Sequence, residues 1–217
     1  MKIATWNLER PNGTHKRNQL IVDALREVDA DILILTETNE MLDYPNCYQG
    51  YHTALLPSNY YKKGERRVSI YSKYETIGSF PTFRDDTSIC ITFNTPLGNL
   101  AVYGTVIGIY GNRRKDFIDD LELILQDIDR ISSLENLCVA GDFNMSWDNY
   151  YFTAESRRKM NESFLRNGLV NLTGDVPQNI DHIVLGEQFA EGKHVLVSAW
   201  NLDKKLSDHV GVCVEVL

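Results

Sequence analysis

Polar residues that could bind a metal or move a proton stand at the borders of five apolar runs in the sequence. Asn7 and Glu9 follow the run 2–6, and Glu37 follows the run 31–36. The other members of the set are Asp142, Asn144, Asp181, Asp208 and His209, each beside a further apolar run. Because ligands of α/β proteins gather where strands end, we expect these segments to meet in one site.

Oxygen donors dominate this set, and His209 is its one imidazole. Carboxylate and amide oxygens are the ligands that magnesium and manganese prefer. The sequence contains no Cys-x-x-Cys or His-x-x-x-His pair for zinc, and no phosphate-binding loop of the nucleotide hydrolases. The set therefore indicates a metal-assisted attack of water, most naturally on phosphorus.

Three short basic groups interrupt the acidic background and lie near aromatic residues. They are Lys62, Lys63, Arg66 and Arg67; Arg113, Arg114 and Lys115; and Arg157, Arg158 and Lys159. Basic residues interleaved with aromatics can bind a nucleic-acid backbone and stack its bases, although a solvated charged face gives the same pattern. Arg113 and Arg114 open a predicted helix, where cations are unfavourable, so we expect them to bind a ligand, with Tyr110 close by.

Trp147 is the remaining candidate for a substrate contact. It follows Asn144 by three residues on a predicted loop. An aromatic side chain in that place either touches the substrate or covers the core, and the sequence leaves both possibilities open.

The elements that must position these residues are short strands and a few amphipathic helices. Apolar residues recur at helical spacing over about 14–28 and 114–132, and more weakly over 154–167. Ten β-branched runs are expected to form strands: 2–6, 31–36, 51–56, 67–72, 88–93, 100–106, 137–140, 180–185, 194–200 and 210–216. Strands outnumber helices, which favours an α/β sandwich. Without a Pro/Gly/Ser-rich linker, residues 1–217 are expected to form one domain.

Each half of the sequence contains a similar unit. A strand, a polar loop and a helix lead to Asp-Ile-Leu-Ile-Leu-Thr-Glu in the first half and to Asn-Leu-Cys-Val-Ala-Gly-Asp in the second. Both units end in an acidic residue. This weak repeat predicts a two-fold arrangement of similar halves.

Composition excludes several classes of protein. The 217 residues are 43% hydrophobic and 24% charged, as in an ordinary globular protein and unlike a disordered or fibrous one. The net charge of −8 argues against a general nucleic-acid coat. No apolar stretch is long enough to span a membrane, and none resembles a signal peptide. With four cysteines and no close pair, a reducing, cytoplasmic setting is expected.

Five motifs in this order resemble the endonuclease/exonuclease/phosphatase superfamily. They are Thr5-Trp6-Asn7, Leu35-Thr36-Glu37-Thr38, Gly141-Asp142-Phe143-Asn144, Ile180-Asp181-His182-Ile183 and Ser207-Asp208-His209. The superfamily includes enzymes similar to exonuclease III and the pancreatic deoxyribonucleases, together with abasic-site endonucleases, sphingomyelinases and inositol-phosphate phosphatases. The resemblance implies a four-layer α/β/β/α sandwich in which helices flank two mixed sheets.

The resemblance also implies roles for the site residues. Glu37 would be the principal ligand of Mg²⁺ or Mn²⁺, assisted by Asn7 and Glu9, with Asp208 beside the metal. Asp142 would orient or deprotonate the attacking water, and Asn144 would hydrogen-bond the phosphate or the water. His209 would contact a phosphate oxygen, and Asp181 would hold His209 in orientation.

The sequence departs from the family pattern in three places. Many members have Tyr or His where Ile107 stands, and Tyr110 is a candidate replacement. The Lys that abasic-site enzymes carry after the principal ligand, and their Trp before the motif at Asp181, are both missing. These differences weaken the DNA-repair interpretation and leave the superfamily interpretation intact.

Three functions remain open at this point. A phosphodiesterase or nuclease is favoured, a phosphatase or phosphodiesterase for a small soluble ester is the alternative, and a non-catalytic binding member is the third. The expected partner is a phosphate ester, with nucleic acid as one possibility. The number of metals, the choice between endo and exo action, and the oligomeric state are not decided by the sequence.

Overall fold

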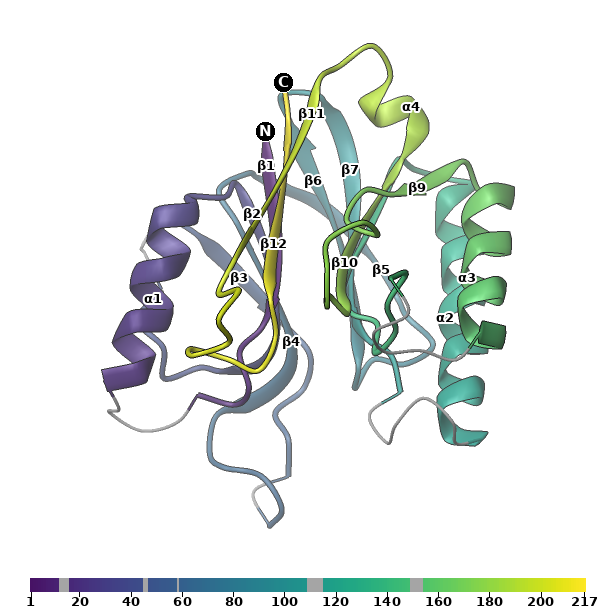
Figure 1. Cartoon of the computed structure of the whole chain (residues 1–217). Coiled ribbons are helices and arrows are strands. Elements are labelled where there is room, and N and C mark those ends of the chain that lie inside the picture. Colours follow the sequence, from purple (N-terminus) through teal and green to yellow (C-terminus); the bar gives the residue numbers. More distant parts are fainter. Residues whose placement is uncertain (12–15, 45–46, 58, 109–114, 149–153) are drawn as a thin grey trace.

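A computed structural model describes residues 1–11, 16–44, 47–57, 59–108, 115–148 and 154–217. Within these ranges two six-stranded sheets pack face to face, with helices on their outer faces (Figure 1). The helices are α1 (Lys16–Val28), α2 (Lys115–Ser132), α3 (Ala154–Arg166) and the single turn α4 (Glu187–Ala190). This arrangement confirms the predicted four-layer sandwich.

Six strands follow one another in space across each sheet. The first sheet contains, in this order, β11 (Val195–Trp200), β12 (Gly211–Val216), β1 (Lys2–Asn7), β2 (Ile32–Asn39), β4 (Glu65–Ser72) and β3 (Gln49–His52). The second sheet contains β5 (Thr76–Phe80), β6 (Ser88–Thr95), β7 (Gly98–Val106), β8 (Leu137–Asp142), β10 (Asp181–Gly186) and β9 (Leu169–Asn171). β1 pairs with β2, and β7 with β8, in parallel, whereas the other strand pairs are antiparallel.

The parallel pairs explain the repeat seen in the sequence. α1 connects β1 to β2 and α2 connects β7 to β8, so each half contains one strand–helix–strand unit. Both units occupy the two central strands of their sheet. The structure therefore confirms two similar halves.

Apolar side chains fill three layers between the sheets and helices. Branched side chains of both sheets, such as Ile34, Ile70 and Val102, form the central layer. Side chains of α2 and α3 pack on the outer face of the second sheet, and those of α1 on the first. Sheets buried on both faces need long apolar strands, which is why their runs are so clear in the sequence.

Element boundaries follow the predictions closely, with three additions. β5, β9 and α4 were not predicted, and the run 51–56 forms β3 (Gln49–His52) with only an isolated bridge at Leu55. β5 is an edge strand with a register shift between Thr76 and Gly78. Its outward face is exposed, so it lacks the alternating apolar pattern that identifies a half-buried strand.

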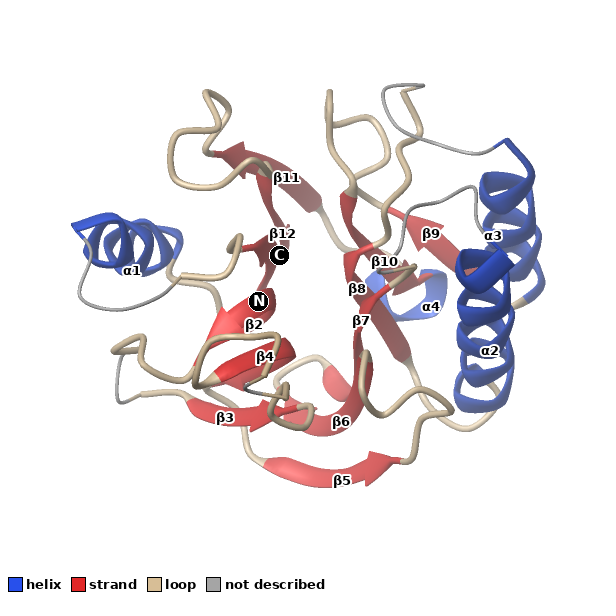
Figure 2. Ribbon diagram, turned by 90° about the horizontal axis from the view of Figure 1, so that it is seen from below, coloured by secondary structure: helices blue, strands red, loops and turns tan. Residues whose placement is uncertain are grey.

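The topology brings the chemistry-bearing residues to one end of the sandwich. β1, β2 and β8 end there, and β10 and β12 begin there. Figure 2 views the molecule from this end, while both chain termini lie at the opposite end in Figure 1. None of the helices in the described part of the chain combines the length and apolar character needed to cross a bilayer.

Candidate active site

Asp142 is the last residue of β8 and lies directly across the ladder from Asp181 on β10. The preceding Gly141 has φ +135°, and a Cβ there would lie 2.0 Å from the carbonyl oxygen of Thr105. Only glycine fits such a close backbone approach. Gly141 therefore allows β8 to carry its terminal carboxylate to the end of the sheet.

Both carboxylate oxygens of Asp142 are held by hydrogen bonds. Asn7 donates from Nδ2 to Oδ2 at 3.0 Å, and the backbone N–H of Asn144 donates to Oδ1 at 2.9 Å. The first bond joins the two sheets, because Asn7 ends β1 and Asp142 ends β8. Burial, opposed by the charge of His209 and reinforced by that of Asp181, raises the pKa of Asp142 to about 7.

Asp181 and His209 form a close pair at the same end. The imidazole Nδ1 of His209 lies 2.5 Å from Oδ2 of the fully buried Asp181. Asn179 brackets the backbone of Asp181 by accepting its N–H and donating to its carbonyl oxygen. The second oxygen, Oδ1 of Asp181, is buried and has no hydrogen-bond partner among the described residues.

His209 is positioned by hydrogen bonds to its backbone. Its N–H donates to the hydroxyl of Ser207, which itself donates to the carbonyl oxygen of Asn7 at 2.7 Å. Its carbonyl oxygen accepts from the indole of Trp6 and the amide of Asn201. Ser207 and Asn201 therefore position His209. One of the sequence motifs includes Ser207, but nothing in the sequence indicates the role of Asn201.

The imidazole of His209 is a cation at neutral pH. Burial lowers its pKa, but the charges of Asp181 and Asp142 outweigh burial and raise the pKa to about 10. Ligand atoms of these three residues lie within 4.8 Å of one another. With the imidazole of His209 protonated beside two carboxylates, the trio can hold charge and move protons.

The residues predicted to bind metal lie around this trio with unequal access. Asn7 touches Asp142, and β1 pairs with β2 so that Asn7 stands opposite Thr36, next to Glu37. Oε2 of Glu37 accepts from Arg10 Nε at 3.1 Å, which leaves Oε1 without a protein partner among the described residues. Glu37 thus keeps an oxygen available for a ligand.

The other two predicted metal ligands face solvent. The side chain of Glu9 is 52% exposed and its carboxylate lies 3.1 Å from Arg17. The side chain of Asp208 is 69% exposed, with Oδ1 3.7 Å from Nε2 of His209. Asp208 therefore borders the site, whereas Glu9 is held in an ion pair beside it.

Asn144 and Ile107 explain one departure from the family pattern. The side-chain amide of Asn144 donates to the carbonyl oxygen of Ile107 at 3.0 Å. The side chain of Ile107 is fully buried in the layer under α2. Ile107 therefore supports Asn144 through its backbone and offers no side chain to a substrate.

Trp147 covers the core beside the site. Its ring lies 4.7 Å from that of His182 and 6.4 Å from that of Phe164, and its Nε1 donates to Asn161. Of the two possibilities left open by the sequence, the structure therefore shows the packing one. Its predicted contact with substrate remains a prediction.

The structure describes the second and third basic groups near aromatic residues, and Tyr110, to different extents. Arg113, Arg114 and Tyr110 lie outside the described residues. In the third basic group, Arg158 pairs with Glu162 and Lys159 pairs with Glu122. These two cations are thus occupied within the chain.

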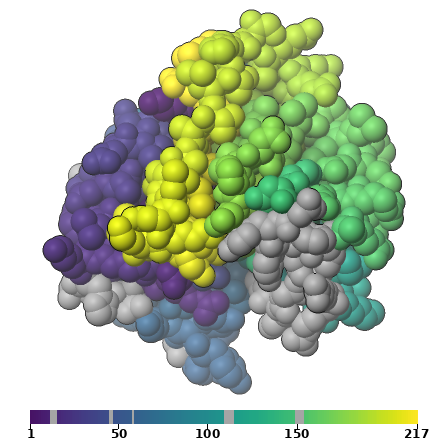
Figure 3. Space-filling model, in the orientation of Figure 1, coloured from purple at the N-terminus to yellow at the C-terminus, as the bar shows by residue number. Residues whose placement is uncertain are grey.

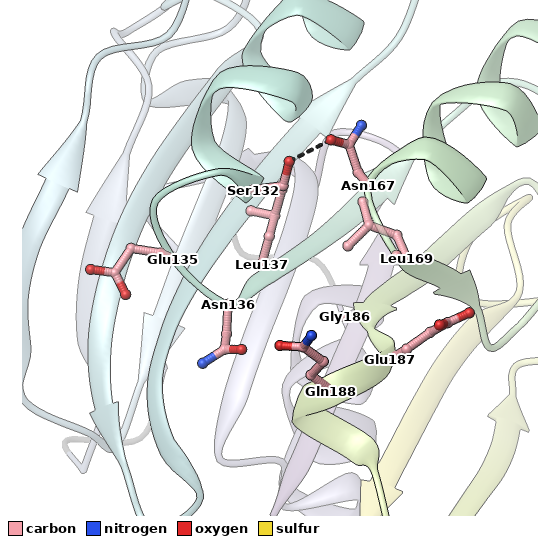
Figure 4. Close-up of a pocket in the computed structure, with 10 residues that line it drawn as sticks. Ser132, Glu135, Asn136, Leu137, Asn167, Leu169, Gly186, Glu187 and Gln188 are labelled. Atoms are coloured by element: carbon pink, nitrogen blue, oxygen red, sulfur yellow. Dashed lines mark hydrogen bonds between the residues drawn. The ribbon is translucent and has the colours of Figure 1, made fainter.

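A separate pocket lies at the opposite end of the second sheet. It measures about 190 Å³ and opens between the ends of α2 and α3 and the start of α4 (Figure 4). Its lining includes Leu137 at the start of β8 and Gly186 at the end of β10. Since Asp142 and Asp181 stand at the other ends of these strands, the pocket is not part of the candidate active site.

The comparisons with known proteins agree with this architecture. A family model described as "Endonuclease/Exonuclease/phosphatase family" matches residues 4–209. No curated protein matches the chain in sequence. The matched range includes all five motifs from Asn7 to His209.

Solved structures extend the similarity to the whole fold. An AP endonuclease from Archaeoglobus fulgidus has a TM-score of 0.71 at 18% identity, covering 100% of this chain and 99% of that one. The AP endonuclease LMAP from Leishmania major has a TM-score of 0.75 at 16% identity, with 98% and 86% covered. The 3′ phosphatase NExo from Neisseria, bound to a product DNA hairpin, gives 0.72 at 17%, with 100% and 99% covered. At these identities the likeness establishes a shared fold.

Proposed function

The chain belongs to the endonuclease/exonuclease/phosphatase family, and from this membership we propose that it is a divalent-metal-dependent phosphodiesterase that uses Asp142 to activate water. The activities named by the family all hydrolyse phosphate esters. The AP endonucleases and the DNA-bound 3′ phosphatase that share the fold support a nucleic-acid substrate for this chain.

The observation that carries the proposal is a buried carboxylate beside a partly buried imidazolium. Asp142, with a pKa of about 7, can accept a proton near neutral pH. His209, with a pKa of about 10, remains a cation there and can stabilise negative charge on a phosphate oxygen. Two carboxylates at one site thereby take different roles, since Asp181 is occupied by the imidazole.

The reaction follows from these positions. Water attacks phosphorus and gives its proton to Asp142, a new P–O bond forms, and the P–O bond to the leaving oxygen breaks. The leaving alkoxide takes a proton from solvent. Asn7 and the backbone of Asn144 hold Asp142 in place, and His209, held by Asp181, faces the developing charge on the phosphate.

The residues present fit a divalent metal. Oε1 of Glu37 is free of protein partners among the described residues, and the carboxylate of Asp208 is accessible. Glu37, assisted by Asn7 and Asp208, would hold Mg²⁺ or Mn²⁺, for which oxygen donors are suited. When bound, the ion supplies Lewis-acid stabilisation of charge on the phosphate oxygens.

Hydrolysis of bis-p-nitrophenyl phosphate tests the proposal. EDTA is expected to abolish release of p-nitrophenol, and added magnesium or manganese to restore it. Glu37→Gln is expected to lower kcat/KM by about 10²-fold or more because it removes the ligand charge. Glu162→Gln, an exposed change on α3, serves as the matched control.

Two results would contradict the proposal. One is full activity of the wild-type protein in EDTA. The other is the failure of this diester, and of nucleic-acid substrates, to be cleaved with either metal by correctly folded protein, which would support a non-catalytic binding member instead.

A further inference from the structure

Arg67 is a buried cation without a carboxylate partner. It lies on β4 and is only 8% exposed. Its Nη2 donates to the hydroxyl of Tyr61 at 2.6 Å, and it forms no ion pair with any carboxylate in the part of the chain that the structure describes. Buried charges are normally paired because removing them from water is costly. An unpaired guanidinium therefore suggests an anion that comes from outside the chain.

Two acidic groups near Arg67, those of Asp86 and Glu37, are bound to other arginines. Asp86 accepts from Arg84 at 3.0 and 3.1 Å. The pKa of Asp86 is lowered, because the hydrogen bond and charge of Arg84, with a smaller contribution from the charge of Arg67, outweigh the effect of burial. Arg67 therefore acts on Asp86 through its charge and not through a hydrogen bond. Glu37 accepts from Arg10. The positive charge of Arg67 is thus left for a ligand.

Tyr61 connects Arg67 to the candidate active site. The Cζ atoms of Arg67 and Arg10 lie 5.1 and 5.6 Å from the centre of its ring. Arg10 also bonds Glu37, the proposed metal ligand. We call Arg10, Tyr61 and Arg67 the Tyr61 cluster. Two guanidinium groups on one ring repel each other, and a bound anion would relieve that repulsion.

The strand register sets the distance of this cluster from the reacting phosphate. β2 pairs with β4 so that Thr36 and Thr38 face Val68 and Arg66, which places Arg67 alongside Glu37. β1, with Asn7 at its end, is the next strand. Neighbouring strands lie about 4.8 Å apart, so Arg67 stands roughly 10 Å from the strand that carries Asn7. A second phosphate of the same substrate can therefore reach Arg67 while the first lies at Asp142 and His209.

We propose that the Tyr61 cluster binds a second phosphate group of the substrate, so that the preferred substrates are phosphodiesters with at least one further phosphate. The inference rests on the proposed function, because it places the reacting phosphate at Asp142 and His209. The second phosphate can be an internal one of an oligonucleotide or a terminal monoester. Arg67 supplies a planar guanidinium, which matches either.

Three short substrates test the proposal in the presence of magnesium. TpT contains one phosphate, pTpT adds a terminal phosphate, and TpTpT adds an internal one. The wild-type protein is expected to cleave one or both longer substrates with a kcat/KM about 10–100-fold above that for TpT, the range of a charge-assisted hydrogen bond. Whether pTpT or TpTpT benefits more identifies the source of the phosphate.

Arg67→Gln is expected to reduce that preference to less than about threefold. Arg158→Gln, which removes an exposed arginine paired within α3, is expected to leave the preference intact. If Arg67→Gln does not fold, as judged by circular dichroism, Tyr61→Phe removes only the hydroxyl that holds Arg67. It is expected to lower the preference by about two- to fivefold.

The outcomes separate this inference from the proposed function. Cleavage of TpT without any gain from a second phosphate would overturn the role of the Tyr61 cluster, as would a full preference in folded Arg67→Gln. Failure to cleave any of the three substrates or bis-p-nitrophenyl phosphate would instead overturn the proposed function on which the inference rests.

Discussion

At the scale of residues, the proton affinities of Asp142 and His209 depend on one another. Burial raises the pKa of Asp142, and the charge of His209 lowers it. Conversely, burial lowers the pKa of His209, and the charges of Asp181 and Asp142 raise it. Removal of one member therefore changes the others. The losses of activity caused by substituting such coupled groups are therefore not expected to add up.

Substitution of His209 tests this coupling. His209→Ala is expected to lower kcat for a diester by about 10²–10⁴-fold, because it removes the cation beside the phosphate. Asp181→Asn is expected to lower kcat as well, and the double variant to be little worse than His209→Ala alone. Steady-state kinetics on bis-p-nitrophenyl phosphate measure all three.

The control for this series is His194→Ala, an exposed histidine at the opposite end of the molecule next to β11. It is expected to retain wild-type kcat. A His209→Ala variant with undiminished kcat would show that the imidazolium has no part in the reaction.

At the scale of elements, strongly patterned segments were predictable and weakly patterned ones were not. The amphipathic stripe of α2 and the buried apolar run of β2 fix their own structure. β9 has three residues and β5 lies exposed at a sheet edge. Short or exposed strands depend on neighbours for their structure, which a sequence pattern does not reveal.

The same reasoning applies to the site. Residues at strand ends, such as Asp142, could be predicted to gather because parallel strands end at one edge of a sheet. The pairing of Arg67 with Tyr61 could not be predicted, because it depends on the fold of the segment between β3 and β4. From the sequence, Glu9 was predicted to assist the metal, but the structure shows that its carboxylate forms an ion pair with Arg17, which the sequence pattern does not reveal.

Gly141 offers a test of how β8 positions Asp142. Gly141→Ala would place a Cβ 2.0 Å from the carbonyl oxygen of Thr105 at φ +135°. The clash with fixed backbone is expected to lower the free energy of unfolding by more than about 3 kcal/mol. Urea unfolding followed by circular dichroism measures this change.

Gly98→Ala is the matched control, because Gly98 has φ +110° but a Cβ at this position would meet no described heavy atom within 4 Å. It is expected to cost only the backbone strain, about 1–2 kcal/mol. Equal losses in the two variants would mean that the close approach to Thr105 is unimportant.

His182 on β10 makes the fold sensitive to acid. Its Nε2 lies 3.0 Å from the carbonyl oxygen of Met145, to which it donates, and its Nδ1 lies 3.2 Å from the hydroxyl of Thr173. Burial lowers its pKa from 6.5 to about 4. Between about pH 6.5 and pH 4, His182 is therefore protonated in the unfolded chain but neutral in the folded chain. The free energy of unfolding falls as the pH falls through that range.

The expected loss between pH 7 and pH 5 is about 2 kcal/mol of unfolding free energy from this one group. His182→Gln cannot titrate, so its unfolding free energy is expected to fall by about 2 kcal/mol less over the same interval. Urea titrations at the two pH values measure the difference. Parallel pH dependence in both proteins would contradict a neutral, buried His182.

At the scale of the whole molecule, the candidate site exists only where the two sheets meet. Asn7 of the first sheet bonds Asp142 of the second, and His209, next to β12, bonds Asp181 of β10. Figure 3 shows the yellow C-terminal segment lying beside the green segment that contains β10. Each sheet thus supplies part of the chemistry, which accounts for motifs spread from Asn7 to His209.

The charge of the whole chain bears on which nucleic acids it would cleave. Because the net charge is −8, the phosphates of duplex DNA repel the chain at long range. Among the described residues, the basic side chains placed near the site are those of the Tyr61 cluster, close to Glu37, whereas Arg158 and Lys159 are paired with acidic residues. A few cations can hold one or two phosphates of a flexible strand but not a long rigid duplex.

We therefore predict that nucleic-acid cleavage favours single strands, ends or short oligonucleotides over intact duplex. With matched sequences and magnesium, kcat/KM for a single-stranded oligonucleotide is expected to exceed that for its duplex by about tenfold or more. Because few phosphates are neutralised, the slope of log kcat/KM against log salt is expected to be shallow, about −0.7 for each phosphate contacted on a single strand. Faster nicking of supercoiled plasmid than of matched single strands would contradict this prediction.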